Sequence, residues 1–260
     1  MATANADTTP GDPIELTGAN VGETAEEVLI ENLTWRVRRD DFWVIGGLHD
    51  AGKSPLLATA AGVQQPLQGR HRLFGRDTAE TAPEDMLAER LRIGLLFDSG
   101  RLLKSLTVAE NVALPLQYHK DMPLEAASET VQSVLELVEV AHLADYYPGQ
   151  IGGSWHMRAT LARALVLRPE VLLCDNPGAG LDPRHSRWWV DFLVSLHGGH
   201  PWLPHRLTLV VATDNLRPWV ERGRQFALLK KKAWLPLGGP AELKASAEPL
   251  LQDLLAADAG

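Results

Sequence analysis

GLHDAGKS, at residues 47–54, fits the pattern G-x-x-x-x-G-K-[ST]. It follows the apolar run FWVIG at residues 42–46 and precedes a helix-compatible stretch at residues 55–62. The glycines of such a pattern let backbone N–H groups turn toward phosphate oxygens, the lysine neutralises the β- and γ-phosphates, and the serine hydroxyl reaches Mg²⁺. We therefore predict a phosphate-binding loop made of Gly47, Leu48, His49, Asp50, Ala51, Gly52, Lys53, Ser54 and Pro55.

Some residues of this loop favour nucleotide binding and others disfavour it. Lys53 and Ser54 favour binding of ATP and Mg²⁺. Asp50 places a carboxylate where the loop would face a polyphosphate, and Pro55 removes a backbone N–H from the first helical turn, although a proline is tolerated there. The loop geometry can survive these changes, whereas its affinity for ATP is in question.

Outward from the loop, apolar runs alternate with helix-compatible stretches. Residues 105–147 are helix-rich, and VLLCD at 171–175 and LTLVVATD at 207–214 resemble strands. Strands that alternate with helices predict an α/β fold with a largely parallel sheet, here preceded by antiparallel β pieces and interrupted by an inserted helical subdomain. The expected organisation is a loose arm at residues 1–13 and a domain at 14–260, with a core at about 14–97 and 158–245, a helical subdomain at about 98–157 and a C-terminal helix at about 246–258.

The composition limits the partners and the compartment. The 260 residues carry a net charge of −8, and an acidic chain is a poor match for nucleic acid because phosphate-backbone binding needs surplus lysine and arginine. No apolar run approaches the roughly 20 residues that cross a bilayer, and the N-terminus lacks the pattern of a secretory signal. The single cysteine excludes an intrachain disulfide and a thiolate zinc cage. We expect a cytoplasmic protein.

With the phosphate loop placed, the other segments follow the order of an ATP-binding cassette of the ABC transporter family, from about residue 14 to residue 243. Within that family the chain is most similar to the ATPase subunit of Mla-type phospholipid transporters, on LLFDSGRLLKSLTVAENVALPL at 95–116 and GPAEL at 239–243. The resemblance implies a RecA-like P-loop core and a dimer that sandwiches ATP between one subunit's phosphate loop and the other's signature motif. It also implies a permease, whose coupling helix would enter a groove formed by residues 98–147 and hold the chain on the inner face of the membrane.

The positions that carry catalysis in the family are altered. Asp175 matches the Walker B aspartate and would hold Mg²⁺ together with Ser54 and with Asp98, which stands at the Q-loop glutamine position. The next position, where the family has its general-base glutamate, is Asn176, and the switch histidine corresponds to Thr213. An amide does not accept a proton at neutral pH, and loss of a general base typically costs about 10²–10⁴-fold in rate.

The signature motif is also changed, whereas the D-loop is kept. The family's L-S-G-G-x aligns with Ile151, Gly152, Gly153, Ser154 and Trp155, so the serine hydroxyl is lost. The D-loop retains Leu181 and Asp182. We expect Trp188 and Trp189, which follow the D-loop, to lie at a dimer face and to hold a nucleotide-free interface together with Trp155.

These departures predict a degenerate cassette of a lipid transporter, with a structural or coupling role and weak or no ATP hydrolysis. The alternative is an active ATPase that drives lipid transport, which could pair with an intact cassette. A third hypothesis is a regulatory module without a permease. A homodimer would lack base, switch and signature serine in both sites, and the sequence does not choose between homodimer and heterodimer.

Overall fold

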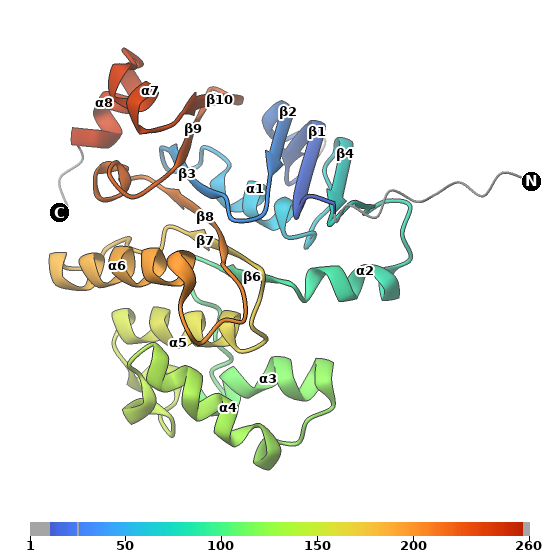
Figure 1. Ribbon diagram of the computed structural model, residues 1–260, viewed down its shortest axis with the longest axis vertical. Coiled ribbons are helices and arrows are strands. Elements are labelled where there is room, and N and C mark those ends of the chain that lie inside the picture. Colours follow the sequence, from blue (N-terminus) through green and yellow to red (C-terminus); the bar gives the residue numbers. More distant parts are fainter. Residues whose placement is uncertain (1–10, 25, 257–260) are drawn as a thin grey trace, which may run out of the picture.

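The structure, a computed structural model, describes residues 11–24 and 26–256 (Figure 1). Most of the predicted N-terminal arm therefore lies outside the described residues, as do residues 257 and 258 of the predicted C-terminal helix. In the described part, no helix is both long enough and apolar enough to span a membrane.

A six-stranded sheet forms the centre of the molecule, in the order β10-β9-β3-β8-β7-β6. All neighbouring strands run parallel except β10, which pairs with β9 in the antiparallel direction. The strands are β3 (Phe42–Gly47), β6 (Ile93–Leu96), β7 (Val171–Asp175), β8 (Thr208–Thr213), β9 (Gln225–Lys230) and β10 (Ala233–Gly238). Every residue of β3, β7 and β8 is buried, as expected of parallel strands that are covered on both faces. The predicted largely parallel sheet is confirmed, and the carboxyl ends of these three strands share one edge of it.

A second, four-stranded sheet is antiparallel and has the order β2-β1-β4-β5. Its strands are β1 (Ile14–Gly22), β2 (Val28–Val37), β4 (Gln68–Leu73) and β5 (Arg76–Asp77). Helix α1 (Lys53–Ala60) lies between the two sheets (Figure 1). Its buried residues Leu56 and Leu57 belong to one apolar cluster with residues of both sheets, such as Leu16 and Ile45. This packing fixes the phosphate loop, which connects β3 to α1.

Three helices, α3 (Val108–Lys120), α4 (Leu124–Leu137) and α5 (Gly153–Leu165), pack against one another on the other side of the parallel sheet (Figure 1). Helix α5 also contacts β6 and so joins this group to the core. Helix α3 begins at a capping box in which the Thr107 side chain accepts a hydrogen bond from the Glu110 backbone N–H and the Glu110 side chain accepts one from the Thr107 N–H. The helix-rich character of residues 105–147 is therefore real, whereas the division into subdomains stays a prediction.

The remaining helices surround the sheets. They are α2 (Pro83–Arg90), α6 (Pro183–Gly199), α7 (Pro240–Ala245) and α8 (Pro249–Ala256), with short 3₁₀ turns η1 (Ala141–Leu143), η2 (Pro148–Gln150) and η3 (Arg217–Trp219). Helix α6 starts at the D-loop because Asp182 caps it, accepting from the backbone N–H of Arg184 at 2.9 Å and of His185 at 3.1 Å.

Candidate functional site

The phosphate loop joins the end of β3 to the start of α1 with the expected strand–loop–helix order. Gly52 caps α1 at a φ of 93°, a left-handed conformation, and a Cβ there would lie 3.1 Å from the Leu29 side chain. Lys53 is 7% exposed and its Nζ donates to the carbonyls of Gly47 and Leu48, both at 2.7 Å. Pro55 falls in the first turn, where the missing N–H would have had no helical partner in any case. The loop is therefore intact as a backbone cradle.

The pocket in front of this loop is strongly acidic. Its wall includes the carboxylates of Glu23, Glu27, Asp50, Asp98 and Asp175. Glu23 and Glu27 belong to the turn between β1 and β2. These two residues belong to no motif recognised in the sequence, although the acidic segment GETAEE at residues 22–27 is a visible signal.

Burial lowers the pKa of the Lys53 ammonium, and nearby negative charges oppose this effect. In order of strength these charges belong to Asp214, Asp175, Asp50 and Asp98. The lysine is therefore already surrounded by carboxylates in the position where it would meet the phosphates of a nucleotide. A polyphosphate entering this pocket meets more negative than positive charge.

Asp175 is the residue that best fits a bound Mg²⁺. It ends β7, is 3% exposed, and its Oδ2 has no hydrogen-bond partner among the described residues. Burial raises the pKa of its carboxyl. The negative charge of Asp98 raises this pKa further, whereas a hydrogen bond from Ser54 lowers it. In the described ranges no group of three or more His, Cys, Asp or Glu side chains could hold a metal by itself. Ser54, Asp98 and Asp175 would therefore need phosphate oxygens to complete an octahedral shell.

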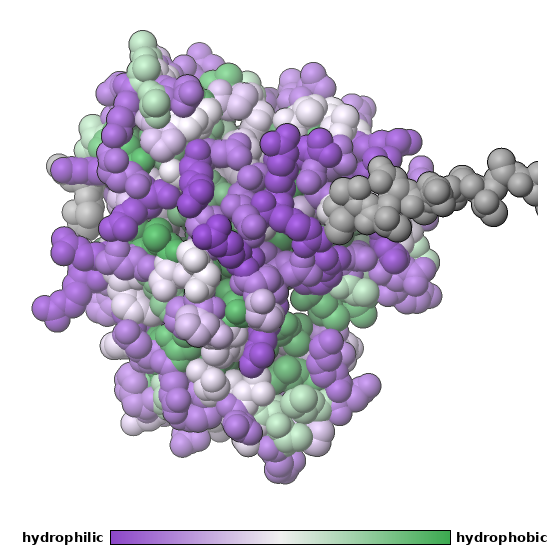
Figure 2. All heavy atoms as spheres, viewed as in Figure 1, coloured by the Kyte–Doolittle hydropathy of each residue, from purple (hydrophilic) through white to green (hydrophobic). Residues whose placement is uncertain are grey.

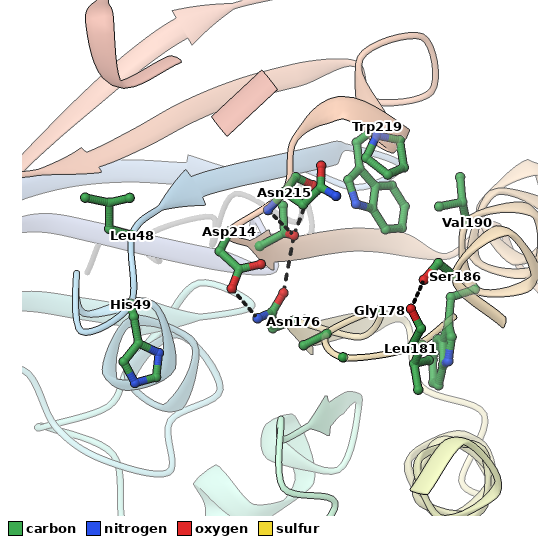
Figure 3. Close-up of a pocket in the computed structure, with 15 residues that line it drawn as sticks. Leu48, His49, Asn176, Gly178, Leu181, Ser186, Val190, Asp214, Asn215 and Trp219 are labelled. Carbon is green, nitrogen blue, oxygen red and sulfur yellow. Dashed lines mark hydrogen bonds between the residues drawn. The ribbon is translucent and has the colours of Figure 1, made fainter. Parts of the chain in front are cut away.

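A second hollow lies beside the first, at the positions of base and switch (Figure 3). Asn176, which directly follows β7, donates from Nδ2 to Asp214 Oδ2 at 3.1 Å. The Thr213 hydroxyl, at the end of β8, lies 3.3 Å from Asn176 Oδ1 and accepts from the Asn215 backbone N–H at 3.1 Å. The replaced side chains thus bond to one another. Asp214, which no sequence motif singled out, is the carboxylate that accepts the hydrogen bond from Asn176.

The signature segment and the D-loop lie elsewhere. Among the described residues, the wall of the phosphate-loop pocket contains none of Ile151, Gly152, Gly153, Ser154 and Trp155. They form the start of α5, with Gly152 as its N-terminal cap. Leu181 of the D-loop borders the second hollow, whereas Asp182 caps α6. Within one chain the structure therefore brings together the loop, Asp98, Asp175 and Asn176, and leaves the signature segment apart.

The expectation for Trp189 is wrong. Its side chain is 1% exposed and belongs to the hydrophobic core, because α6 turns this position toward the sheet. Trp155 and Trp188 are half-buried and contact Arg158. Their role at a dimer face stays a prediction.

The loop that follows Asp98 is held by residues that the sequence analysis passed over. Arg163 of α5 donates to the carbonyls of Gly100 and Arg101, both at 2.9 Å. The fully buried Asn111 donates from Nδ2 to the carbonyls of Leu103, Leu106 and Thr107 and accepts from the Leu103 N–H at 2.8 Å. Asp98 is therefore connected through a well-bonded loop to the layer formed by α3, α4 and α5, which we call the helical layer.

Comparison with known proteins agrees with the fold and the loop. The sequence model of the family described as "ABC transporter" matches residues 30–179. The "Methionine import ATP-binding protein MetN" of Geobacillus kaustophilus is 34% identical over 168 residues, which cover 65% of this chain and 49% of that protein. The "Probable ribonucleotide transport ATP-binding protein mkl" of Mycobacterium leprae is 28% identical over 225 residues, 86% of this chain and 63% of that protein. The dimeric structure of MJ0796, a bacterial ABC transporter cassette, superposes with a TM-score of 0.75 at 25% identity and covers 85% of this chain and 95% of that one.

The fold and the phosphate loop define a class of protein, the ATP-binding cassettes. This chain belongs to the ABC transporter family. It spans about half the length of MetN relatives that it matches.

Proposed function

We propose that this chain is the cassette subunit of a transporter in which it has a structural or coupling role, with weak or no ATP hydrolysis of its own. The observation that carries the proposal is Asn176 at the position of the general base, bonded to Asp214 and Thr213. The amide of Asn176 has no basic group to offer an attacking water, and its donor is already used by Asp214. Loss of a base alone typically reduces the rate by about 10²–10⁴-fold.

The charge of the pocket supports the same proposal. Nucleotide binding relies on positive groups and backbone N–H donors that face the phosphates. Here Asp50 adds a carboxylate to the loop itself, and Asp98 adds another where the family has a neutral amide. Repulsion between these groups and a triphosphate weakens binding, even though the loop backbone has the right form.

The partner that we propose is a permease bound at the helical layer. Large apolar or aromatic side chains are exposed there: Leu103 at 50%, Tyr118 at 84%, Leu124 at 39%, Tyr146 at 48% and Tyr147 at 47%. Figure 2 shows apolar groups at the surface over this part of the molecule. The loop from Asp98 to Thr107 links this surface to the phosphate-loop pocket through Arg163 and Asn111. We propose that this surface receives a coupling helix and holds the chain on the inner face of the membrane.

The cargo that we propose is a phospholipid-type lipid, on the resemblance of residues 95–116 to Mla-type ATPase subunits. The names of the relatives refer to methionine and ribonucleotide transport. Because these names differ in cargo, they support transport as a class and no single substrate.

The second candidate is an active ATPase that drives transport, paired with an intact cassette. It is favoured by the buried Lys53, by Asp175 Oδ2, which has no hydrogen-bond partner in the described part of the chain, and by the D-loop aspartate that caps α6. In such a heterodimer, the phosphate loop of this chain would face the intact signature motif of the other cassette.

Restoring the missing groups tests the proposal. The background is Gly152→Ser with Ser154→Gly, which rebuilds the order S-G-G at the start of α5. In this background we compare Asn176→Glu plus Thr213→His with the matched control Asn176→Gln plus Thr213→His, measuring phosphate release at saturating Mg·ATP. We expect the glutamate variant to hydrolyse ATP at least about tenfold faster than the control, because only it carries a base. Hydrolysis by the unmodified chain as fast as by the glutamate variant would contradict the proposal.

A further inference from the structure

Helices α5 and α6 meet through a buried arginine. Arg158 of α5 is 4% exposed, and its guanidinium carbon lies 3.5 Å from the centre of the Trp188 ring on α6 and 4.9 Å from that of the Trp155 ring on α5. Stacking of a guanidinium on an indole is strongest when both groups are shielded from water. The contact therefore joins the helical layer to a helix of the core.

Glu139, just after α4, completes this contact. Its carboxylate lies 2.6 Å from Arg158 Nη1 and also accepts a hydrogen bond from Trp188. Burial alone would raise the pKa of Glu139, but these hydrogen bonds and the charge of Arg158 lower it overall. The carboxylate is therefore ionised at neutral pH and bonds to both sides of the junction at once.

A second set of rings bridges the same helices at their N-terminal ends. The Trp155 ring meets the edge of His185 on α6, with 5.8 Å between ring centres and an angle of 88°. On its other side it meets His142 of η1 at 5.4 Å and 89°. His185 Nδ1 lies 2.6 Å from Asp182 Oδ2, so the D-loop aspartate orients the imidazole.

We propose that Trp155, Arg158, His185 and Trp188 form a strut between α5 and α6, and that this strut holds the helical layer in one orientation on the parallel-sheet core without any nucleotide. The same strut connects the signature segment directly to the D-loop helix within one chain. Movement of the helical layer would have to separate the edge-on rings of Trp155 and His185, lift the Arg158 guanidinium off the Trp188 ring and expose it. The inference concerns orientation of the layer and does not depend on whether the chain hydrolyses ATP.

The test measures the distance between spin labels on the two sides of the strut. Cys174 is the only cysteine in the sequence and is fully buried, so labels attach selectively at Val63→Cys, next to α1, and Ser133→Cys, on α4. We compare the unmodified strut with Trp188→Ala and with Trp188→Phe, which keeps a ring. The matched control is Trp202→Ala, because Trp202 also stacks on an arginine, Arg168 at 5.3 Å, away from this junction.

We expect a narrow distance distribution that Mg·ATP does not change, and a distribution at least about twofold broader in Trp188→Ala, because the layer then samples other orientations. Trp188→Phe and Trp202→Ala should keep the narrow distribution. If Trp188→Ala does not fold, Glu139→Gln, which keeps the side-chain shape at an exposed position, should broaden the distribution in the same direction. The proposal is overturned if Trp188→Ala and Glu139→Gln both leave the width of the distribution unchanged, or if Trp202→Ala broadens it equally. It is also overturned if the distribution of the unmodified protein is already broad.

Discussion

Lys53 shares its surroundings with carboxylates from four places in the chain: Asp50 of the loop, Asp98 after β6, Asp175 at the end of β7 and Asp214 after β8. The pattern G-x-x-x-x-G-K-[ST] located Lys53 and Asp50, and the resemblance located Asp98 and Asp175, whereas neither located Asp214. The nearness of Lys53 and Asp214 depends on the pairing of β3 with β8 in the sheet, which no local pattern states. The hydrogen bonds that join Asn176 to Asp214 and Thr213 could not be predicted either, because they depend on the pairing of β7 with β8.

The charges around Lys53 yield a binding prediction. Replacement of Asp50 and Asp98 by asparagine should raise the affinity for Mg·ATP about tenfold at low salt, because each change removes a negative charge near the phosphates. Asparagine suits position 50, whose φ of 59° is left-handed. The measurement is isothermal titration at low and high salt, with Glu129→Gln on the exposed side of α4 as the control. Equal affinities at low salt of the unmodified protein, the Asp50→Asn plus Asp98→Asn variant and the Glu129→Gln control would show that the two carboxylates do not limit binding.

At the scale of elements, continuous apolar runs were the reliable signal. FWVIG, VLLCD and LTLVVATD became β3, β7 and β8, because strands buried on both faces must be apolar throughout. In the apolar segment RLRIGLLF at residues 90–97, only Ile93–Leu96 form a strand, β6, and Arg90 ends α2. Helix α2 went unrecognised because only Met86 and Glu89 of its residues are buried, which leaves no apolar periodicity to detect.

The loop between β6 and α3 shows how one side chain can hold an element. Asn111→Ala should lower the free energy of unfolding by about 3 kcal/mol, because it removes four hydrogen bonds and leaves the part-buried N–H of Leu103 and carbonyl of Leu106 without this partner. Urea denaturation provides the measurement. Gln132→Ala removes an exposed hydrogen bond on α4 and should change the stability by less than about 0.5 kcal/mol. A loss as small for Asn111→Ala would mean that the loop is held by other contacts.

At the scale of the whole molecule, part of the acidic composition can be assigned to one site. Carboxylates line the phosphate-loop pocket, and a strut of aromatic and cationic side chains joins the helical layer to the core. Together these features describe a cassette whose shape is maintained by its own side chains. The architecture followed from the sequence because the strand–loop–helix order is local; the strut did not, because it joins residues that only the packing of α5 against α6 brings together.

The central claim is that this chain contributes shape and coupling without turnover at its own phosphate loop. Its most direct test is ATP turnover by the purified membrane complex that contains this chain, with and without Lys53→Ala. Circular dichroism of each purified protein verifies that the variant is folded. Because Asn176 offers no base and carboxylates surround Lys53, we predict that Lys53→Ala leaves turnover unchanged. Turnover that Lys53→Ala abolishes would contradict the account.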